Sequence, residues 1–217
     1  FEIRDDLLNR TLTNGPVREF TQNERGCVRP ITSIALKDRI VRHVLIDKLI
    51  MPAVRTHIIY DNCASVKGRG IDLQRKRFEI HLRRYYREYG NEGYILFGDF
   101  SKFYDNIIHE IAKQQLLALF DNDDFLDWLL TLIFDGFKID ASYMSDEEFE
   151  SCMTDLFIKN EYRKIPKSQL TGEKWMEMSV NIGDQLSQVL GIYYPHRIDN
   201  FVKYAKSEKF YGRYMDD

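Results

Sequence analysis

Three carboxylates stand where two apolar stretches of the sequence end. Asp99 directly follows the run YILFG at residues 94–98, and Asp216 and Asp217 follow the aromatic-rich run FYGRYM at residues 210–215. If the two runs lie side by side, the three like charges repel one another and raise one another's pKa. Divalent cations relieve that repulsion, and Mg²⁺ prefers carboxylate and phosphate oxygens. The acids therefore predict a two-ion site that supports in-line phosphoryl displacement.

Two short strands and several helices are expected to position these acids. Residues 94–99 are typical of a buried strand that ends at a cleft, and residues 208–214 of a final strand. Apolar residues at helical spacing predict helices over four ranges: residues 37–54, 71–90, 107–120 and 184–204. Gly90 closes the second helix, because glycine readily ends a helix. This mixture predicts an α+β fold.

The composition is that of a globular protein with a hydrophobic core. The 217 residues are 44% hydrophobic and 30% charged, and no apolar run approaches the roughly 18 residues of a membrane span. The net charge of −3 is unevenly distributed along the chain. Residues 1–90 hold 18 basic and 11 acidic side chains, whereas residues 91–217 hold 13 basic and 23 acidic side chains. A basic half can bind phosphate while an acidic half binds metal cations. Because the three cysteines lie far apart, we expect a reducing, cytoplasmic setting. Because no apolar run is long enough to span a membrane, we expect no membrane partner.

A basic loop with two glycines precedes the helix that begins near residue 71. Gly68 and Gly70 allow the backbone to approach a phosphate closely, and guanidinium groups suit phosphate oxygens. One face of the helix carries six basic side chains: Arg75, Lys76, Arg77, Arg83, Arg84 and Arg87. A solvated helix face is the alternative interpretation of these charges.

Five segments together resemble the conserved motifs of one enzyme family. Residues 97–107 (FGDFSKFYDNI) resemble motif A of reverse transcriptases, residues 182–188 (IGDQLSQ) resemble motif B, and residues 214–217 (YMDD) match motif C. Residues 35–54 and 65–78 resemble the first two fingers motifs of bacterial reverse transcriptases. The motifs follow the family's order, which makes coincidence a poor explanation.

The resemblance implies the right-hand polymerase arrangement of fingers and palm. Fingers would comprise residues 1–92 and a palm residues 93–217, with residues 121–178 as an excursion or insertion that returns toward the fingers. The palm would be an antiparallel sheet backed by helices. The return strand of the motif C hairpin, the primer grip and the thumb are absent from the sequence, which begins at Phe1 and is expected to be a piece of a longer protein. We therefore expect weak or no processive synthesis from this chain alone.

The resemblance also assigns the metal ligands. Asp99 and Asp216 correspond to the aspartates that bridge two Mg²⁺ ions, with Mn²⁺ as an alternative ion. Asp217 corresponds to the third acid and is more peripheral to the metals. Phe100 would offer its backbone carbonyl to the second ion.

The nucleotide site is assigned in the same way. Arg39, Lys67 and Arg69 would contact the incoming triphosphate. Tyr104 occupies the position of the steric gate, where its ring would clash with a 2′-hydroxyl and favour deoxynucleotides. A packed core aromatic is the alternative for this residue. Gly183 would allow close approach of the backbone to template or nucleotide.

Six residues are assigned to template and primer: Arg75, Arg77, Arg83, Ser187, Gln188 and Met215. Contacts between arginine and the template backbone would be independent of sequence and sensitive to salt. Ser187 and Gln188 would orient the motif B helix near the template, and ordinary helix-start residues are the alternative. The variant Ile-Gly-x-x-x-Ser-Gln resembles the reverse transcriptases of diversity-generating retroelements and, more distantly, group II intron and retron enzymes.

The expected function is RNA-directed DNA synthesis, in which a primer 3′-hydroxyl attacks a deoxynucleotide. The partners would be an RNA template, a DNA or RNA primer and dNTPs, in a bacterial or phage-encoded system; an accessory protein is left open. Two alternatives stay open. One is an RNA-dependent RNA polymerase, which the bulk of Tyr104 opposes, and the other is a non-catalytic RNA-binding module with a polymerase-like shell.

Overall fold

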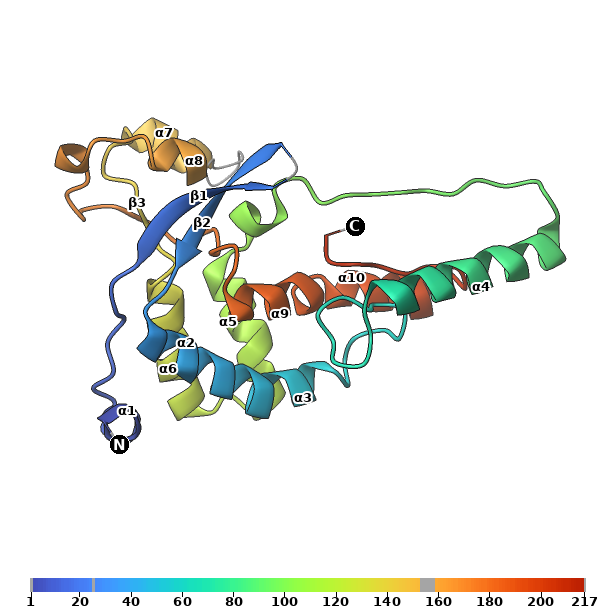
Figure 1. Ribbon diagram of the computed structural model, residues 1–217, viewed down its shortest axis with the longest axis horizontal. Coiled ribbons are helices and arrows are strands. Elements are labelled where there is room, and N and C mark those ends of the chain that lie inside the picture. Colours follow the sequence, from blue (N-terminus) through green and yellow to red (C-terminus); the bar gives the residue numbers. More distant parts are fainter. Residues whose placement is uncertain (1, 25, 153–158, 217) are drawn as a thin grey trace. The chain divides into compact units, whose positions relative to one another are not determined.

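The computed structural model describes residues 2–24, 26–152 and 159–216 (Figure 1). Contacts divide the chain into two compact units, each formed from two separate stretches. Unit 1 comprises Phe1–Ile46 and Lys102–Ser187, and unit 2 comprises Asp47–Ser101 and Gln188–Asp217. This division differs from the predicted boundary at residue 92. The assignment of fingers and palm stays a prediction.

Unit 1 consists mainly of helices with one hairpin. Its helices are α1 (Glu2–Leu8), α2 (Leu36–Leu45), α5 (His109–Leu117), α6 (Asp124–Asp135), α7 (Asp146–Cys152), α8 (Lys159–Tyr162) and the first residues of α9 (Gln185–Tyr193). Its strands are β1 (Arg18–Glu24), β2 (Cys27–Ser33), β3 (Ile139–Asp140) and β4 (Trp175–Met176). The predicted excursion over residues 121–178 belongs to this unit.

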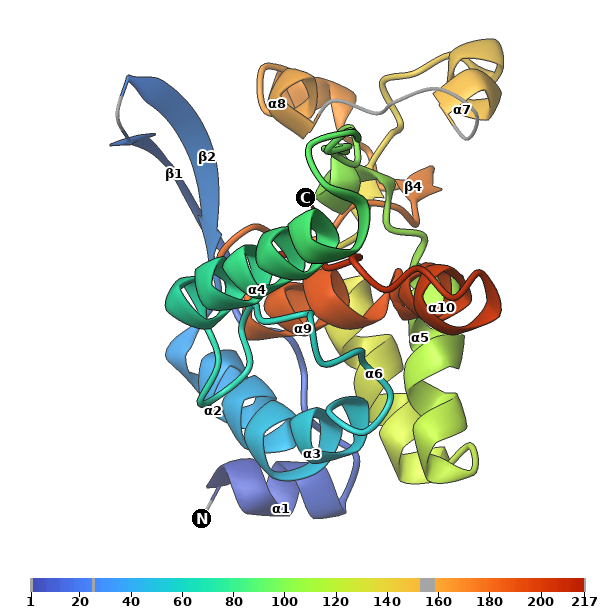
Figure 2. The same ribbon diagram turned by 90° about the vertical axis from the view of Figure 1, so that its right-hand side faces the viewer.

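Helices α5 and α6 pack against one another in unit 1 (Figure 2). Leu116 on α5 and Leu130 on α6 are fully buried, as the helical spacing of apolar residues requires. Asp123 begins α6 because its carboxylate accepts a hydrogen bond from the backbone N–H of Leu126 at 2.8 Å. The predicted helix over residues 107–120 is therefore present as α5 and a following 3₁₀ turn.

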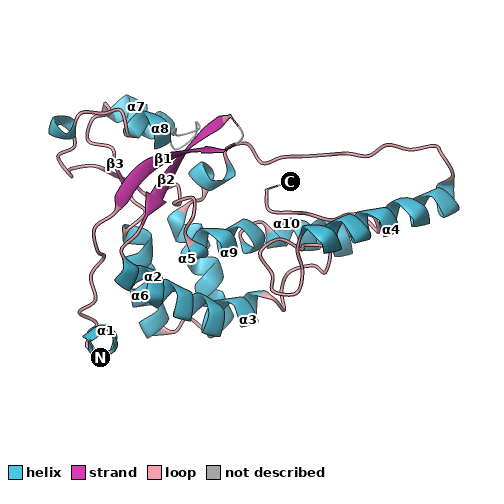
Figure 3. Cartoon of the chain, viewed as in Figure 1, coloured by secondary structure: helices cyan, strands magenta, loops and turns pink. Residues whose placement is uncertain are grey.

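The two sheets of the described chain are small and antiparallel (Figure 3). β1 pairs with β2 over seven residues, from Arg18 opposite Ser33 to Glu24 opposite Cys27. β3 pairs with β4 over two residues. Helices and antiparallel strands together confirm the predicted α+β class.

Unit 2 contains α3 (Met51–Val54), α4 (Ile71–Tyr89), the rest of α9, α10 (His196–Asn200) and a π-helical segment (Phe201–Ala205). α4 spans 19 residues between two glycines in left-handed backbone conformations, Gly70 at φ 142° and Gly90 at φ 73°. Amino acids other than glycine rarely adopt such positive φ angles. The predicted helix and its closure at Gly90 are confirmed.

The strand predicted over residues 94–99 is wrong. This stretch doubles back along α4 without forming a helix or strand (Figure 1). Tyr94 and Leu96 are 102% and 95% exposed, so the run is not buried. An apolar strand becomes buried only when partner strands and a packing layer cover it. Within the described chain this segment has no partner strand, and its one ring contact joins Phe97 to Phe78 of α4, with ring centres 6.3 Å apart. The palm sheet predicted from it is therefore not formed.

The final predicted strand is reduced to a single bridge. Arg213 pairs with Asn62 in parallel, and its neighbours in residues 208–214 belong to no ladder. The helix predicted over residues 184–204 is interrupted at Pro195, whose ring prevents a continuous helix, and resumes as α10. Among the described residues, none of the helices is both long and apolar enough to cross a membrane.

Candidate active site

The segments that carry the predicted metal ligands meet within unit 2. The backbone N–H of Phe100 donates to the carbonyl oxygen of Asp216 at 3.1 Å. The side chain of Asp99 is exposed and that of Asp216 is half-buried, so both carboxylates can reach solvent. Asp217 lies outside the described residues. Among the residues that the structure describes, no three His, Cys, Asp or Glu side chains form a metal-binding group.

Carboxylates of this kind fit Mg²⁺ by their chemistry, because hard oxygen donors suit a hard cation. Asp99, Asp216 and the carbonyl of Phe100 are the donors that unit 2 offers around the bond between Phe100 and Asp216. The arrangement brings two of the three predicted acids into neighbouring backbone positions. The chemistry of these donors suits Mg²⁺, and the two-ion site stays a prediction.

The chain around Asp216 is held by Arg213, which is only 3% exposed. Its guanidinium pairs with Asp199 of α10 at 2.9–3.0 Å and donates to the carbonyls of Gly191 at 2.8 Å and Ile192 at 2.7 Å. It also donates to the carbonyl of Met215. One side chain thereby fixes the Met-Asp segment to the ends of two helices.

Met215 adopts a positive φ of 59°, which is uncommon for a residue with a side chain. Such conformations store strain and persist only where the surroundings enforce them. The hydrogen bond from Arg213 to its carbonyl is one such constraint. The turn that presents Asp216 is thus set by a buried arginine rather than by local preference.

A second buried carboxylate, Asp61, organises the same unit. Arg77 donates to it at 2.5 Å, Lys203 at 3.0 Å, and His81 lies 3.5 Å away. Burial acts to raise the pKa of Asp61, but hydrogen bonds from Arg77 and Lys203 outweigh it and the pKa falls below its usual value. Burial lowers the pKa of His81, which favours the neutral imidazole. Asp61 thus stays charged and binds two cations.

Lys203 also fixes the chain that leads to the acids. Besides Asp61, its ammonium group donates to the carbonyls of Lys209 at 2.9 Å and Tyr211 at 3.0 Å. The hydroxyl of Tyr211 in turn donates to Asp199 at 2.7 Å. The segment before Asp216 is therefore attached to the rest of unit 2 at several points.

Two predicted ligand-binding arginines already have protein partners. Arg77, assigned to the template, pairs with Asp61, and its guanidinium lies 5.2 Å from the ring of Tyr60. Arg69, assigned to the triphosphate, donates to the carbonyls of Ile59, Tyr60 and Asn62. These contacts stabilise the loop before α4 and compete with the predicted roles.

The other predicted basic residues lie at the surface. Arg39 donates to the hydroxyl of Ser33 at 3.0 Å, and Arg83 pairs with Glu79 at 3.5 Å. Lys67 and Arg75 are exposed. Surface positions leave these side chains able to reach a ligand.

The predicted motif B lies at the start of α9, with residues 182–187 in unit 1 and Gln188 in unit 2. Gly183 has φ 97°, and a Cβ there would meet only Ile31, at 3.9 Å. The backbone conformation, rather than crowding, therefore requires glycine. Ser187 is 2% exposed and donates to the carbonyl of Asn181 at 2.6 Å, so its hydroxyl orients the chain before α9 instead of facing a template. Gln188 is exposed.

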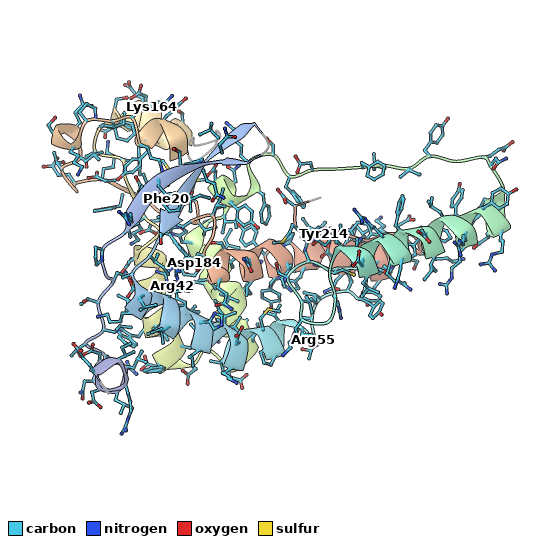
Figure 4. The ribbon with its side chains drawn as sticks, in the orientation of Figure 1. Phe20, Arg42, Arg55, Lys164, Asp184 and Tyr214 are labelled. Atoms are coloured by element: carbon cyan, nitrogen blue, oxygen red, sulfur yellow. The ribbon has the colours of Figure 1, made fainter. Side chains whose placement is uncertain are left out.

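An ion pair that the sequence did not indicate fixes this helix start. Asp184 accepts from the backbone N–H of Leu186 at 2.8 Å, and its second oxygen pairs with buried Arg42 of α2 (Figure 4). The guanidinium of Arg42 also lies 5.0 Å from the ring centre of Phe137. Asp184 thus joins the cap of α9 to α2.

Tyr104 lies in a 3₁₀ turn (Phe103–Asn106) of unit 1 and is half-buried. Its ring meets Phe103 edge-on at 5.3 Å, and its carbonyl accepts from the N–H of Val180 at 3.0 Å. These contacts are compatible with a packed aromatic. The role as a steric gate stays a prediction.

No protein-family model matches the chain, and comparison with curated proteins found no match.

Proposed function

We propose that this chain carries the nucleotidyl-transfer site of an RNA-directed DNA polymerase. The observation that carries the proposal is the backbone hydrogen bond between Phe100 and Asp216, at 3.1 Å. It joins the segment after Asp99 to the Tyr-Met-Asp-Asp segment, two stretches more than a hundred residues apart in the sequence. The order of the five motif-like segments supports the same function. The Ile-Gly-x-x-x-Ser-Gln variant supports a place near the diversity-generating retroelement branch.

The roles of the protein groups follow from their chemistry. When bound, two Mg²⁺ ions would activate the primer hydroxyl and neutralise the leaving pyrophosphate. Asp99 and Asp216 would hold the ions with their carboxylates, and Phe100 would add its carbonyl. Arg213 holds the backbone around Tyr214 in place. Its side chain is anchored to Asp199 of α10 and donates a hydrogen bond to the carbonyl of Met215. Tyr104 would exclude the ribose 2′-hydroxyl and so select deoxynucleotides.

Addition of a single nucleotide to a DNA primer on an RNA template tests the proposal. We expect incorporation that requires Mg²⁺ and that falls at least about 100-fold in Asp99→Asn and in Asp216→Asn, because several kcal/mol of charge stabilisation are lost. Glu147→Gln is the matched control, since Glu147 is an exposed acid on α7. Incorporation that persists in both aspartate variants would refute the assignment.

The same assay separates the alternatives. Preference for ribonucleotides over deoxynucleotides would indicate an RNA-dependent RNA polymerase. Binding of RNA without any incorporation would indicate a non-catalytic module.

A further inference from the structure

A basic hollow lies on unit 2, between the second half of α4 and the segment that precedes the Tyr-Met-Asp-Asp residues. Its volume is about 390 Å³, within the range of roughly 300–1,000 Å³ typical of ligand sites. It is lined by His81, Arg84, Arg87, Glu88, Lys209 and Phe210. The site described above uses none of the charged groups of this hollow for chemistry.

Two guanidinium groups in the hollow lack a carboxylate partner. Within the described parts of the chain, the side chain of Arg84 makes no hydrogen bond or ion pair, and that of Arg87 donates only through Nε, to the carbonyl of Arg83 at 3.2 Å. Lys209, by contrast, pairs with Glu88 at 3.0 Å. The hollow therefore carries two uncompensated positive charges that fit an anion.

The floor of the hollow is aromatic. Phe210 meets His81 at 6.0 Å, Tyr85 at 5.5 Å and Tyr89 at 6.5 Å between ring centres, each in an edge-on arrangement. Aromatic rings beside arginines are the combination that binds single-stranded nucleic acids, because rings stack on bases while guanidiniums bind phosphates.

The hollow is coupled to the candidate active site by the chain itself. Lys203 donates to the carbonyls of Lys209 and Tyr211, on either side of Phe210, and so fixes the floor of the hollow. The same stretch continues directly into Asp216. A strand bound in the hollow would thus lie against the segment that presents the acids.

We propose that this hollow binds the phosphodiester backbone of single-stranded nucleic acid. Arg84 and Arg87 bind phosphate oxygens, and Phe210 contacts a base or sugar. This assignment extends the proposed function. The choice of nucleic acid rather than an acidic peptide as the bound anion rests on that function. The uncompensated charge and the aromatic floor come from the structure alone.

Equilibrium binding of a labelled oligouridine of about 16 nucleotides, without Mg²⁺ or dNTPs, tests the assignment. We expect Arg84→Gln with Arg87→Gln to weaken binding at least about tenfold near 0.1 M salt. The slope of log affinity against log salt should become shallower by about 1.4, or about 0.7 for each lost phosphate contact. Phe210→Leu should weaken binding with little change in slope, because it removes stacking rather than charge.

The charge-matched control is Arg55→Gln with Arg197→Gln, two exposed arginines of unit 2 outside the hollow. An equal loss of affinity in this control, or an unchanged salt slope in the hollow variant, would overturn the assignment. Competition by a polyglutamate peptide as effective as that by unlabelled oligouridine would also overturn it in favour of an acidic peptide. Loss of incorporation in Asp99→Asn tests the polymerase separately, because this binding assay needs no catalysis.

Discussion

At the scale of single residues, Arg213 determines where Asp216 lies. Its guanidinium joins Asp199, two carbonyls of α9 and the carbonyl of Met215. Arg213→Lys keeps the charge but loses the planar fork, so the Met-Asp turn should shift. Because a shift of about 1 Å at a reacting centre lowers rates about 100-fold, we expect kcat for nucleotide addition to fall 10- to 100-fold with a smaller change in KM.

A purely structural role for Arg213 would give a different result. Loss of activity would then follow the fraction of unfolded protein, and higher Mg²⁺ would not restore it. We expect instead that Arg213→Lys stays folded at assay temperature, as melting curves report, and needs more Mg²⁺ for half-maximal rate. Arg213→Leu is the harsher comparison, because it leaves buried Asp199 with the Tyr211 hydroxyl but without a cationic partner, at a cost of about 3–5 kcal/mol.

At the scale of elements, Asp184 decides where α9 begins. It caps the helix through the N–H of Leu186 and pairs with buried Arg42. Asp184→Asn keeps a capping oxygen but loses the ion pair, whereas Asp184→Ala loses both. We expect the free energy of unfolding to fall by about 3–5 kcal/mol in the alanine variant, of which about 1 kcal/mol is the cap. Urea denaturation measures the free energy of unfolding of both variants.

A double variant provides the control for that experiment. Asp184→Ala with Arg42→Met removes both charges and fills the space over Phe137 with an apolar chain. Apolar replacement of a whole buried pair is often neutral, so the double variant should recover most of the loss beyond the cap. If the double variant is no more stable than Asp184→Ala, the buried charge of Arg42 is not what destabilises the single variant.

The helices could be predicted from the sequence, but the strand at residues 94–99 could not. Helical spacing and the flanking glycines determine α4 within one segment, because its hydrogen bonds are local. A strand exists only when another strand pairs with it, and the sequence of YILFG does not contain its partner. Exposed Tyr94 and Leu96 follow from that difference.

The site was predictable in part for a similar reason. Asp99 and Asp216 stand in recognisable motifs, and the bond between Phe100 and Asp216 places their backbones together. The partnership of Arg213 with Asp199 was not predictable, because a charge pair between a helix and an irregular segment has no fixed spacing. The available signal was weak: a charged residue among aromatic residues at 210–214.

At the scale of the whole molecule, three buried histidines link stability to pH. His81 and His196 in unit 2 are 7% and 8% exposed, and His109 in unit 1 is 4% exposed. Burial is the main cause that lowers the pKa of each, below the ordinary 6.5, although a neighbouring oxygen opposes it. The folded chain therefore takes up protons less readily than the unfolded chain at these positions.

The sign of the effect follows from linkage. Well above pH 6.5 both states are neutral at these histidines and stability is at its full value. As pH falls below that value the unfolded chain binds protons that the folded chain rejects, so stability decreases. Asp61 adds a separate loss only below the ordinary carboxyl pKa of 3.8, because its own pKa is lowered by Arg77 and Lys203. We expect the melting temperature to fall progressively between about pH 6.5 and pH 5.

Replacement of single histidines shows which unit loses stability as the pH falls. His109→Gln should flatten the pH dependence of unit 1, and His81→Gln should reduce that of unit 2, where His196 remains, as hydrogen exchange in each unit would report. In each variant, hydrogen exchange of the other unit, whose histidines are unchanged, is the control and should keep its pH dependence. A melting temperature that stays constant or rises as pH drops from about 6.5 to about 5 would contradict the account, since buried neutral imidazoles must oppose protonation.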